Sequence, residues 1–158
     1  MPNVTVSNPA YLPSGYELSL RVHGSEAGGL GMDASQTGTF YRRATAIEDW
    51  RSPLAVYLSG PGAPDLAATE KKQGEQIDLG IVGIKAVYHD GLWMLGQGAE
   101  QLDMGDVVVH WDSSTLHSIT ARWDGGTCAV RGPKGRGVGY DELINVVKSM
   151  FLPVSTRT

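Results

Sequence analysis

The sequence predicts an α+β fold in which a curved, half-barrel-like antiparallel β-sheet is packed by one C-terminal helix. Three observations lead to this prediction. Several short segments alternate apolar and polar residues, which is typical of half-buried strands. Asp-Gly turns join neighbouring segments, as tight β-hairpins require. Only one segment, near the C-terminus, repeats apolar residues at helical spacing, so we expect it to cover the sheet.

The composition indicates a single globular domain over residues 1–158. A domain of this length buries roughly 70% of its unfolded surface, so it requires no metal or disulfide to fold. Hydrophobic residues make up 41% of the chain and charged residues 19%, which is an ordinary globular mixture. The 21 Gly and 8 Pro suit many short strands joined by turns.

Charge and cysteine content exclude several classes of function. The net charge of −4 argues against binding to nucleic acid, which usually needs a strongly basic face. A single cysteine excludes an intramolecular disulfide and a cysteine-rich zinc module. No apolar run reaches the ~18 residues of a membrane span, and the first residues do not resemble a signal peptide. We expect either an extracytoplasmic domain whose natural leader or anchor has been removed, or a cytoplasmic protein.

The first half of the chain predicts three strands and a long loop. Residues 16–22 alternate strictly between apolar and polar types, which indicates a half-buried strand. Segment 23–38 is rich in Gly and Ser, so we expect a loop that could act as a mobile lid over a cavity. Short strands are predicted at 39–43 and at 54–58, the second being ended by Gly and Pro residues.

The middle of the chain predicts an exposed segment followed by a hairpin. Residues 65–76 are polar and fit a short exposed helix or loop. Residues 81–88 place apolar side chains on one face of a strand. The Asp90-Gly91 pair then favours a hairpin turn, with 92–95 as the returning strand and His89 exposed beside the turn.

A second hairpin is predicted further along. Residues 107–111 and 118–123 both alternate like strands. The sequence Asp124-Gly125-Gly126 is a strong hairpin signal that leads into a strand at 127–131. A Gly-rich loop at 132–139 ends this β region.

The C-terminal helix is predicted over about 140–151. Its apolar stripe consists of Leu143, Ile144, Val146, Val147, Met150 and Phe151. Gly139 is a tolerable N-cap, and the two acidic residues that follow Tyr140 favour the positive end of the helix dipole. We expect Pro153 to stop the helix.

Three groups of residues are candidate binding sites. The basic loop with Arg131, Lys134 and Arg136 precedes a helix N-terminus, where proteins often bind anions, although the loop lacks the P-loop spacing and is more simply a solvated connector. A concave sheet lined by aromatic and sulfur-containing side chains would suit an apolar ligand, although such residues are more often core. The candidates for that pocket are Trp93, Met94 and Trp111.

The four histidines offer a metal or catalytic alternative. His110 and Asp112 would share one face of a strand, and His117 follows closely. None of them has the helical spacing of a known zinc motif, so we predict no metal and no cofactor. Cys128 is expected to be a buried small hydrophobe rather than a nucleophile, and no nucleophile elbow or carboxylate pair stands out. We therefore predict no catalytic residues and no enzyme.

The two ends of the chain resemble a known family. The segment 11–18 resembles an opening strand with the pattern LP-x-GY, and a Trp-Asp-Gly-Gly hairpin at 123–126 is followed by Val130-Arg131-Gly132 and a helix over 140–150. Together they resemble the uncharacterised extracytoplasmic domain of anti-sigma-factor-like bacterial membrane proteins. That domain is similar in turn to periplasmic lipoprotein carriers and sigma-E regulators, whose fold is a curved antiparallel sheet covered by helices. Gly139 stands where the family's helix begins with Ser or Thr, and residues 1–10 contain no segment that resembles the family's membrane anchor.

The resemblance implies a function but supplies no catalytic residues. It implies a non-enzymatic, extracytoplasmic sensor or accessory domain that binds a protein, a peptide or a lipid-like ligand. One alternative is a small metal-binding protein or hydrolase that uses His110, Asp112 and His117, with Cys128 as a further candidate. A second alternative is a purely structural interaction module that offers an edge strand or the helix face to a partner.

Overall fold

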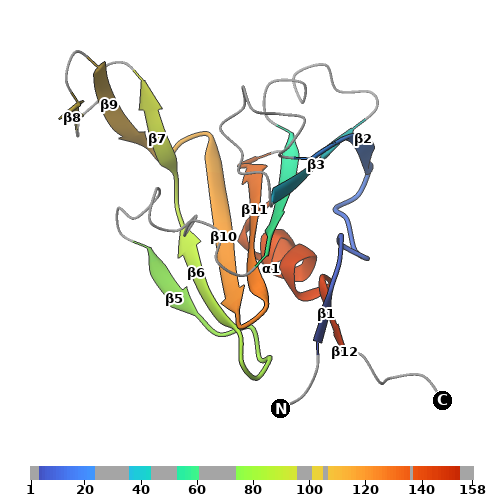
Figure 1. Cartoon of the computed structure of the whole chain (residues 1–158). Helices are drawn as coiled ribbons and strands as arrows, with labels where there is room; N and C mark the ends of the chain where they lie inside the picture. The colour runs from blue at the N-terminus through green and yellow to red at the C-terminus, as the bar shows by residue number, and fades with distance from the viewer. Residues whose placement is uncertain are drawn as a thin grey trace.

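Antiparallel pairing joins the described strands into one large sheet and two small ones (Figure 1). The computed structural model of the chain describes residues 4–23, 36–43, 53–60, 74–95, 101–104, 107–135 and 137–153. The large sheet has the order β2 (Tyr16–His23), β3 (Gln36–Arg43), β4 (Leu54–Ser59), β11 (Gly126–Pro133), β10 (Leu116–Trp123), β6 (Lys85–His89) and β5 (Glu75–Ile77). A three-stranded sheet contains β7 (Leu92–Leu95), β9 (Val107–Asp112) and β8 (Gln101–Met104). A two-stranded ribbon pairs β1 (Val4–Val6) with β12 (Phe151–Pro153).

The predicted antiparallel sheet with a C-terminal helix is confirmed. Every strand of the large sheet runs antiparallel to its neighbours. The sheet is neither closed nor strongly curled, so its curvature is weaker than that of a half-barrel. The helix α1 (Tyr140–Lys148) lies against β10 and β11 on one face of this sheet.

The helix forms for the reasons that the sequence gives, but it is shorter than predicted. Leu143, Val146 and Val147 recur on one face and are buried. Gly139 is the N-cap and makes no side-chain hydrogen bond there, as expected for glycine. The prediction of a helix to residue 151 is wrong, because Ser149 caps the C-terminus and Phe151 begins β12.

The N-terminal segment ties the helix to the rest of the molecule. After β1, the Ser7 amide donates to the Met150 carbonyl at 3.1 Å. Further along, the Tyr11 amide donates to Ser149 Oγ at 3.1 Å, and the Tyr11 hydroxyl donates to Glu142 Oε1 at 2.6 Å. Strands β1 and β12, from the first and last described parts of the chain, therefore lie side by side (Figure 1).

The hydrophobic core lies between α1 and the central strands. Residues two apart on each strand point toward the helix, as the period of a strand requires. These core residues are Leu54 and Val56 of β4, Cys128 and Val130 of β11, and Ile119 and Ala121 of β10. The central strands are thus buried on their helix-facing side.

The opposite face of the sheet is buried at its centre as well. Ser118, Thr120 and Thr127 point away from the helix and are nonetheless buried. His89 pairs with Ser118 in the register and is only 2% exposed. The prediction that His89 is exposed is wrong, because a residue beside a turn can still face the buried part of a two-sided sheet.

Only one of the two predicted hairpins forms. The Asp124-Gly125-Gly126 turn joins β10 to β11 as predicted, with Trp123 opposite Gly126. The predicted hairpin at Asp90-Gly91 is wrong, because β6 pairs with β10 and β7 pairs with β9 in a different sheet. The chain turns at Gly91 (φ +132°) and leaves the large sheet there.

Several predicted boundaries move. Residues 81–84 form a turn rather than the start of a strand, with the Ile84 amide donating to the Ile81 carbonyl at 3.3 Å. Residues 75 and 76 belong to the short strand β5 instead of a helix or loop, and residues 65–73 of that prediction lie outside the described residues. The predicted loop 23–38 is shorter, because Gln36–Gly38 already belongs to β3. The suggested lid falls on residues 24–35, which lie outside the described residues.

Candidate functional site

One edge of the large sheet is long and carries exposed leucines, whereas the other is short and polar. Among the described strands, β2 pairs only with β3 and presents eight residues along a free edge. At the other edge, β5 has three residues, of which Glu75 and Gln76 are exposed. Short edge strands are a common protection against unwanted pairing; β2 is not short, and its protection consists of a bulge and charged side chains.

Two leucines of β2 remain half exposed. Leu18 is 52% exposed and Leu20 is 49% exposed, although strict alternation predicts that both are half-buried on one face. A bulge at Ser19 explains the difference, because Leu18 pairs with Tyr41 and Leu20 with Phe40. These partners are successive residues of β3, so the bulge places the two leucines on opposite faces of the strand pair.

Basic side chains flank this edge. Arg42 of β3 donates from Nη1 to Ser19 Oγ at 2.6 Å, which holds the bulged residue in place. The Arg43 guanidinium lies 5.7 Å from the centre of the Tyr16 ring, a cation–π distance. Arg21 is exposed on β2 itself. Together with Glu17, strands β2 and β3 carry three arginines and one glutamate, a net formal charge of +2 in a chain whose total is −4.

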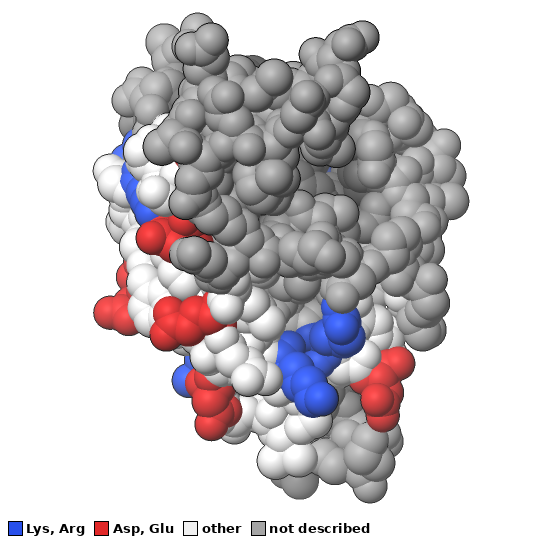
Figure 2. Space-filling view, turned by 90° about the vertical axis from the view of Figure 1, so that its left-hand side faces the viewer, with Lys and Arg blue, Asp and Glu red and all other residues white. Residues whose placement is uncertain are grey.

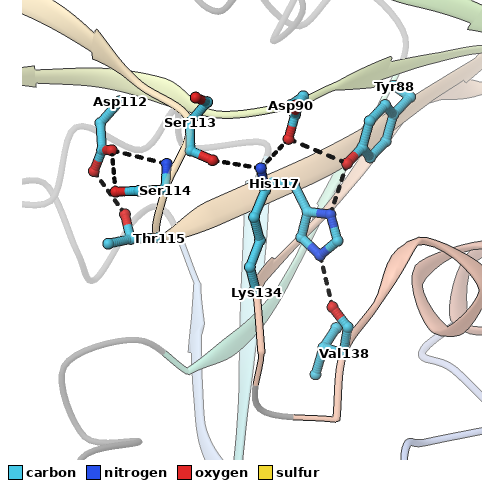
Figure 3. A network of polar contacts seen from close by, with 9 residues as sticks. All are labelled: Tyr88, Asp90, Asp112, Ser113, Ser114, Thr115, His117, Lys134 and Val138. Atoms are coloured by element: carbon cyan, nitrogen blue, oxygen red, sulfur yellow. Dashed lines mark hydrogen bonds and ion pairs between the residues drawn. The ribbon is translucent and has the colours of Figure 1, made fainter.

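A second feature is a polar network at one end of the sheet, built around a buried histidine (Figure 3). His117 of β10 is 3% exposed. Its Nε2 lies 2.6 Å from the Val138 carbonyl oxygen, which can only accept, so Nε2 carries the proton. The other ring nitrogen, Nδ1, lies 2.8 Å from the hydroxyl of Tyr88 on β6 and accepts a hydrogen bond from it when the ring is neutral.

The network continues from Tyr88 to the surface. The Tyr88 hydroxyl lies 3.5 Å from Asp90 Oδ1, which is long for an O–H···O bond. That same oxygen forms an ion pair with Lys134, and the Lys134 ammonium also donates to the Ser113 carbonyl. The Lys134 amide donates to the Thr115 carbonyl at 2.8 Å. The side chain of Lys134 thus joins the turn before β10 to Asp90 after β6.

The environment shifts the pKa of both central groups toward their neutral forms. Burial raises the pKa of Tyr88 to about 12, and the negative charge of Asp90 contributes to the rise. Burial also lowers the pKa of His117 below its ordinary value of 6.5, with Lys134 adding to the decrease. A tyrosine that resists ionisation is a poor nucleophile, and His117 Nε2 is already engaged by a carbonyl. The network is therefore suited to holding strands together rather than to nucleophilic catalysis.

The residues of the metal alternative have separate roles where the structure describes them. Asp112 accepts from the Ser114 amide at 2.9 Å, from Ser114 Oγ at 2.6 Å and from Thr115 Oγ1 at 2.8 Å, so its carboxylate holds its own turn. His117 belongs to the Tyr88 network, and His110 lies on β9, where its side chain is outside the described part. Within the described residues, no group of three or more His, Cys, Asp or Glu side chains could hold a metal ion.

The apolar-ligand candidates come together in the small sheet. Trp93 of β7 lies opposite Trp111 of β9, and Met94 lies opposite His110. Only the backbones of these four residues are described, so a pocket formed by their side chains stays a prediction.

The anion candidates do not form one group in the described structure. Lys134 is engaged by Asp90 and by the Ser113 carbonyl. Arg131 lies on β11 and points to the opposite face from the core residue Val130. Arg136 lies outside the described residues.

Sequence reasoning missed the main features of both sites. Tyr88 lies on β6 and Asp90 follows it by two positions, just after the strand, but nothing in the sequence shows that β10 lies beside them. Cys128, by contrast, is buried as predicted, and burial raises the pKa of its thiol to about 12.

The described surface and the comparisons add little to these two features. On the β5–β6 side, basic and acidic side chains lie in separate small groups among uncharged residues (Figure 2). In the part of the chain that the structure describes, no helix has the length and apolar character needed to cross a membrane.

Comparison with protein-family models, with characterised proteins and with solved structures finds no match.

Proposed function

We propose that this chain is a non-enzymatic binding domain that takes up an extended segment of another protein as an additional strand beside β2. The observation that carries the proposal is the edge of β2, which pairs only with β3 among the described strands, is eight residues long and has two half-exposed leucines. Strand addition supplies affinity through main-chain hydrogen bonds and specificity through alternate side chains. The extracytoplasmic location follows from the family resemblance and stays a prediction.

The bulge in β2 favours a bound segment that fits the local shape of this edge over pairing with any exposed strand. Because Leu18 and Leu20 lie on opposite faces, an added strand meets one apolar side chain on each face. Bulges and charges along an edge discourage self-association of flat strands. A partner must therefore fit an edge with a defined local twist, and we expect apolar residues on both faces of the bound segment.

The charges favour an acidic segment. Strands β2 and β3 have a net formal charge of +2, and Arg21 is exposed on the edge strand itself. Opposite charges across an interface increase the association rate and suppress wrong partners. A segment that combines apolar residues with Asp or Glu is thus the partner that this edge favours.

Selection from a peptide library tests the proposal. Random peptides about 12 residues long, enough to span an eight-residue strand, are displayed on phage and selected on the immobilised chain. Peptides retained by the Leu18→Lys/Leu20→Lys double variant are discarded. We expect the surviving peptides to contain apolar and acidic residues, and to bind the double variant at least about tenfold more weakly by calorimetry.

Two matched controls accompany this selection. Val82 is 79% exposed in a turn away from β2, so Val82→Lys makes the same change elsewhere and should leave affinity within about twofold. Arg21→Glu should weaken binding, most strongly at low salt, whereas Lys85→Glu on β6 reverses a charge away from the edge and should not.

Three results would overturn the proposal. The first is a selection in which every enriched peptide also binds the double variant. The second is a lipid-sized mass increment on the purified chain in native mass spectrometry, lost in the double variant, which would assign a lipid to this edge. The third is a concentration-dependent dimer that the double variant abolishes, which would make a second copy of the chain the occupant.

A further inference from the structure

The Tyr88–His117 pair has two hydrogen-bonding arrangements, and only one is compatible with a neutral histidine. With His117 neutral, Nδ1 is an acceptor and receives a hydrogen bond from the Tyr88 hydroxyl at 2.8 Å. With His117 protonated, both ring nitrogens are donors, so Nδ1–H must donate to the Tyr88 oxygen. Nε2 donates to the Val138 carbonyl in either state, which fixes the ring and leaves Nδ1 as the nitrogen that changes.

We propose that His117, Tyr88 and Asp90 form a pH-sensitive switch, in which protonation of His117 turns the Tyr88 hydroxyl toward Asp90 and thereby weakens the Lys134 contact that holds the loop before α1. The added proton stays on Nδ1. Tyr88 keeps its own proton and exchanges one acceptor, His117 Nδ1, for another, Asp90 Oδ1. This proposal does not depend on the β2 edge.

The position of Asp90 links protonation of His117 to the Lys134 contact. Its Oδ1 is 3.5 Å from the Tyr88 hydroxyl and is the same oxygen that pairs with Lys134. When the hydroxyl turns toward Oδ1, it competes with the ammonium group for that oxygen. The carboxylate is 60% exposed and the Lys134 side chain 27% exposed, so both can move without opening the core.

The charged and titratable neighbours act on His117 in opposite directions, since Asp90 favours its protonated form and Lys134 disfavours it. From β6 and the turn after it, Tyr88 and Asp90 face the His117 ring, and from the loop after β11 Lys134 does so. Tyr140 of α1 packs edge-on against the Tyr88 ring at 4.9 Å. Glu75 of β5 adds negative charge near Tyr88. Protonated His117 would repel the Lys134 ammonium, which weakens the same contact further.

The loop responds because Lys134 is one of its anchors. Its amide donates to the Thr115 carbonyl at 2.8 Å, and its side chain reaches the Ser113 carbonyl. The chain then passes Val138, which is buried and accepts from His117, and enters α1 at Tyr140. Weakening the Lys134 contact therefore releases the first part of the loop while the Val138 anchor remains.

Nuclear magnetic resonance of the ¹⁵N-labelled chain tests the switch. As the pH is lowered from about 7.5 until the His117 ring takes up a proton, its Nδ1 resonance should move from that of an acceptor to that of a protonated nitrogen. Over the same titration, the protection factor of the Lys134 amide against hydrogen exchange should fall about tenfold. Protection of Leu143 in α1, whose amide donates to the Gly139 carbonyl, should stay constant as an internal control.

Two variants separate the switch from simple charge repulsion. In Tyr88→Phe, His117 can still be protonated but the hydroxyl is absent, so the pH-dependent loss of Lys134 protection should drop to less than about a third of the wild-type effect. In Asp90→Asn, a surface change that should fold normally, Lys134 protection should be low at every pH. Constant Lys134 protection while His117 titrates, or an equal change in Tyr88→Phe, would overturn the proposal.

Discussion

The Tyr88 hydroxyl lies 2.8 Å from His117 Nδ1, and this contact joins neighbouring strands β6 and β10 on the face that carries the helix. The two rings also meet edge to face, with centroids 5.7 Å apart. Because His117 is buried, water cannot readily replace this hydrogen bond, and its loss leaves a polar atom without a partner. The pair should therefore contribute measurably to stability.

Tyr88→Phe tests that contribution. The substitution removes the hydroxyl and keeps the ring, so it should lower the free energy of unfolding by about 1–2 kcal/mol, the usual cost of leaving a buried polar atom without its partner. Chemical denaturation at pH 7.5 provides the measurement. Tyr140→Phe is the control, because Tyr140 is 40% exposed and its ring contact is retained; it should change stability by less than about 0.5 kcal/mol. Equal effects of the two substitutions would contradict this account of the pair.

Stability should fall in mildly acidic solution because of His117. Its pKa is lowered in the folded state, so the unfolded chain binds the proton more readily. The contribution of His117 is therefore complete above about pH 6.5 and is lost as the pH falls from there toward the folded-state pKa. Denaturation midpoints measured across this window should decrease more steeply for the wild type than for His117→Gln. Parallel curves for the two proteins would contradict the prediction.

The thiol of Cys128 should be inert in the folded protein. It is fully buried in the core, and burial raises its pKa to about 12. Thiolate is the reactive form, so a thiol reagent should modify Cys128 only when the chain unfolds. The labelling rate measured at pH 8 should then equal the unfolding or opening rate and should rise with denaturant. Rapid, denaturant-independent labelling would show that Cys128 is accessible.

Gly126 should tolerate no side chain. It has a φ of +154°, and a Cβ at this position would stand 2.1 Å from the Ser59 carbonyl oxygen of β4. Gly126→Ala should lower the free energy of unfolding by about 3 kcal/mol or more, since both the backbone and strand β4 must shift. Gly80→Ala is the control: Gly80 also has a positive φ, +76°, but lies in open space, so only the backbone strain of about 1–2 kcal/mol applies.

Local patterns were enough to predict several strands and one hairpin of the fold. Alternation in 54–58, 107–111 and 118–123 follows directly from the period of a strand, and each segment is a strand in the structure. The Asp124-Gly125-Gly126 turn formed because glycine at its end permits the required backbone angles.

The other features of the fold and of the two sites depend on pairing between strands that are distant in the sequence, so local patterns could not predict them. Asp90-Gly91 carries the same turn signal, but β7 pairs with β9 because the choice of partner depends on strands distant in the sequence. The exposure of Leu18 and Leu20 depends on the position of β2 at the edge and on its bulge, neither of which alternation reveals. The His117 network likewise depends on the register of β6 against β10.

Hydrogen exchange of the β2 amides with and without a selected peptide tests the central claim most directly. The account predicts that saturating peptide slows exchange along β2, at amides that do not bond to β3, by at least about tenfold. Amides of β5, at the opposite edge, should be unchanged. Protection that appears instead on β5, on α1 or nowhere in β2 would contradict strand addition at this edge.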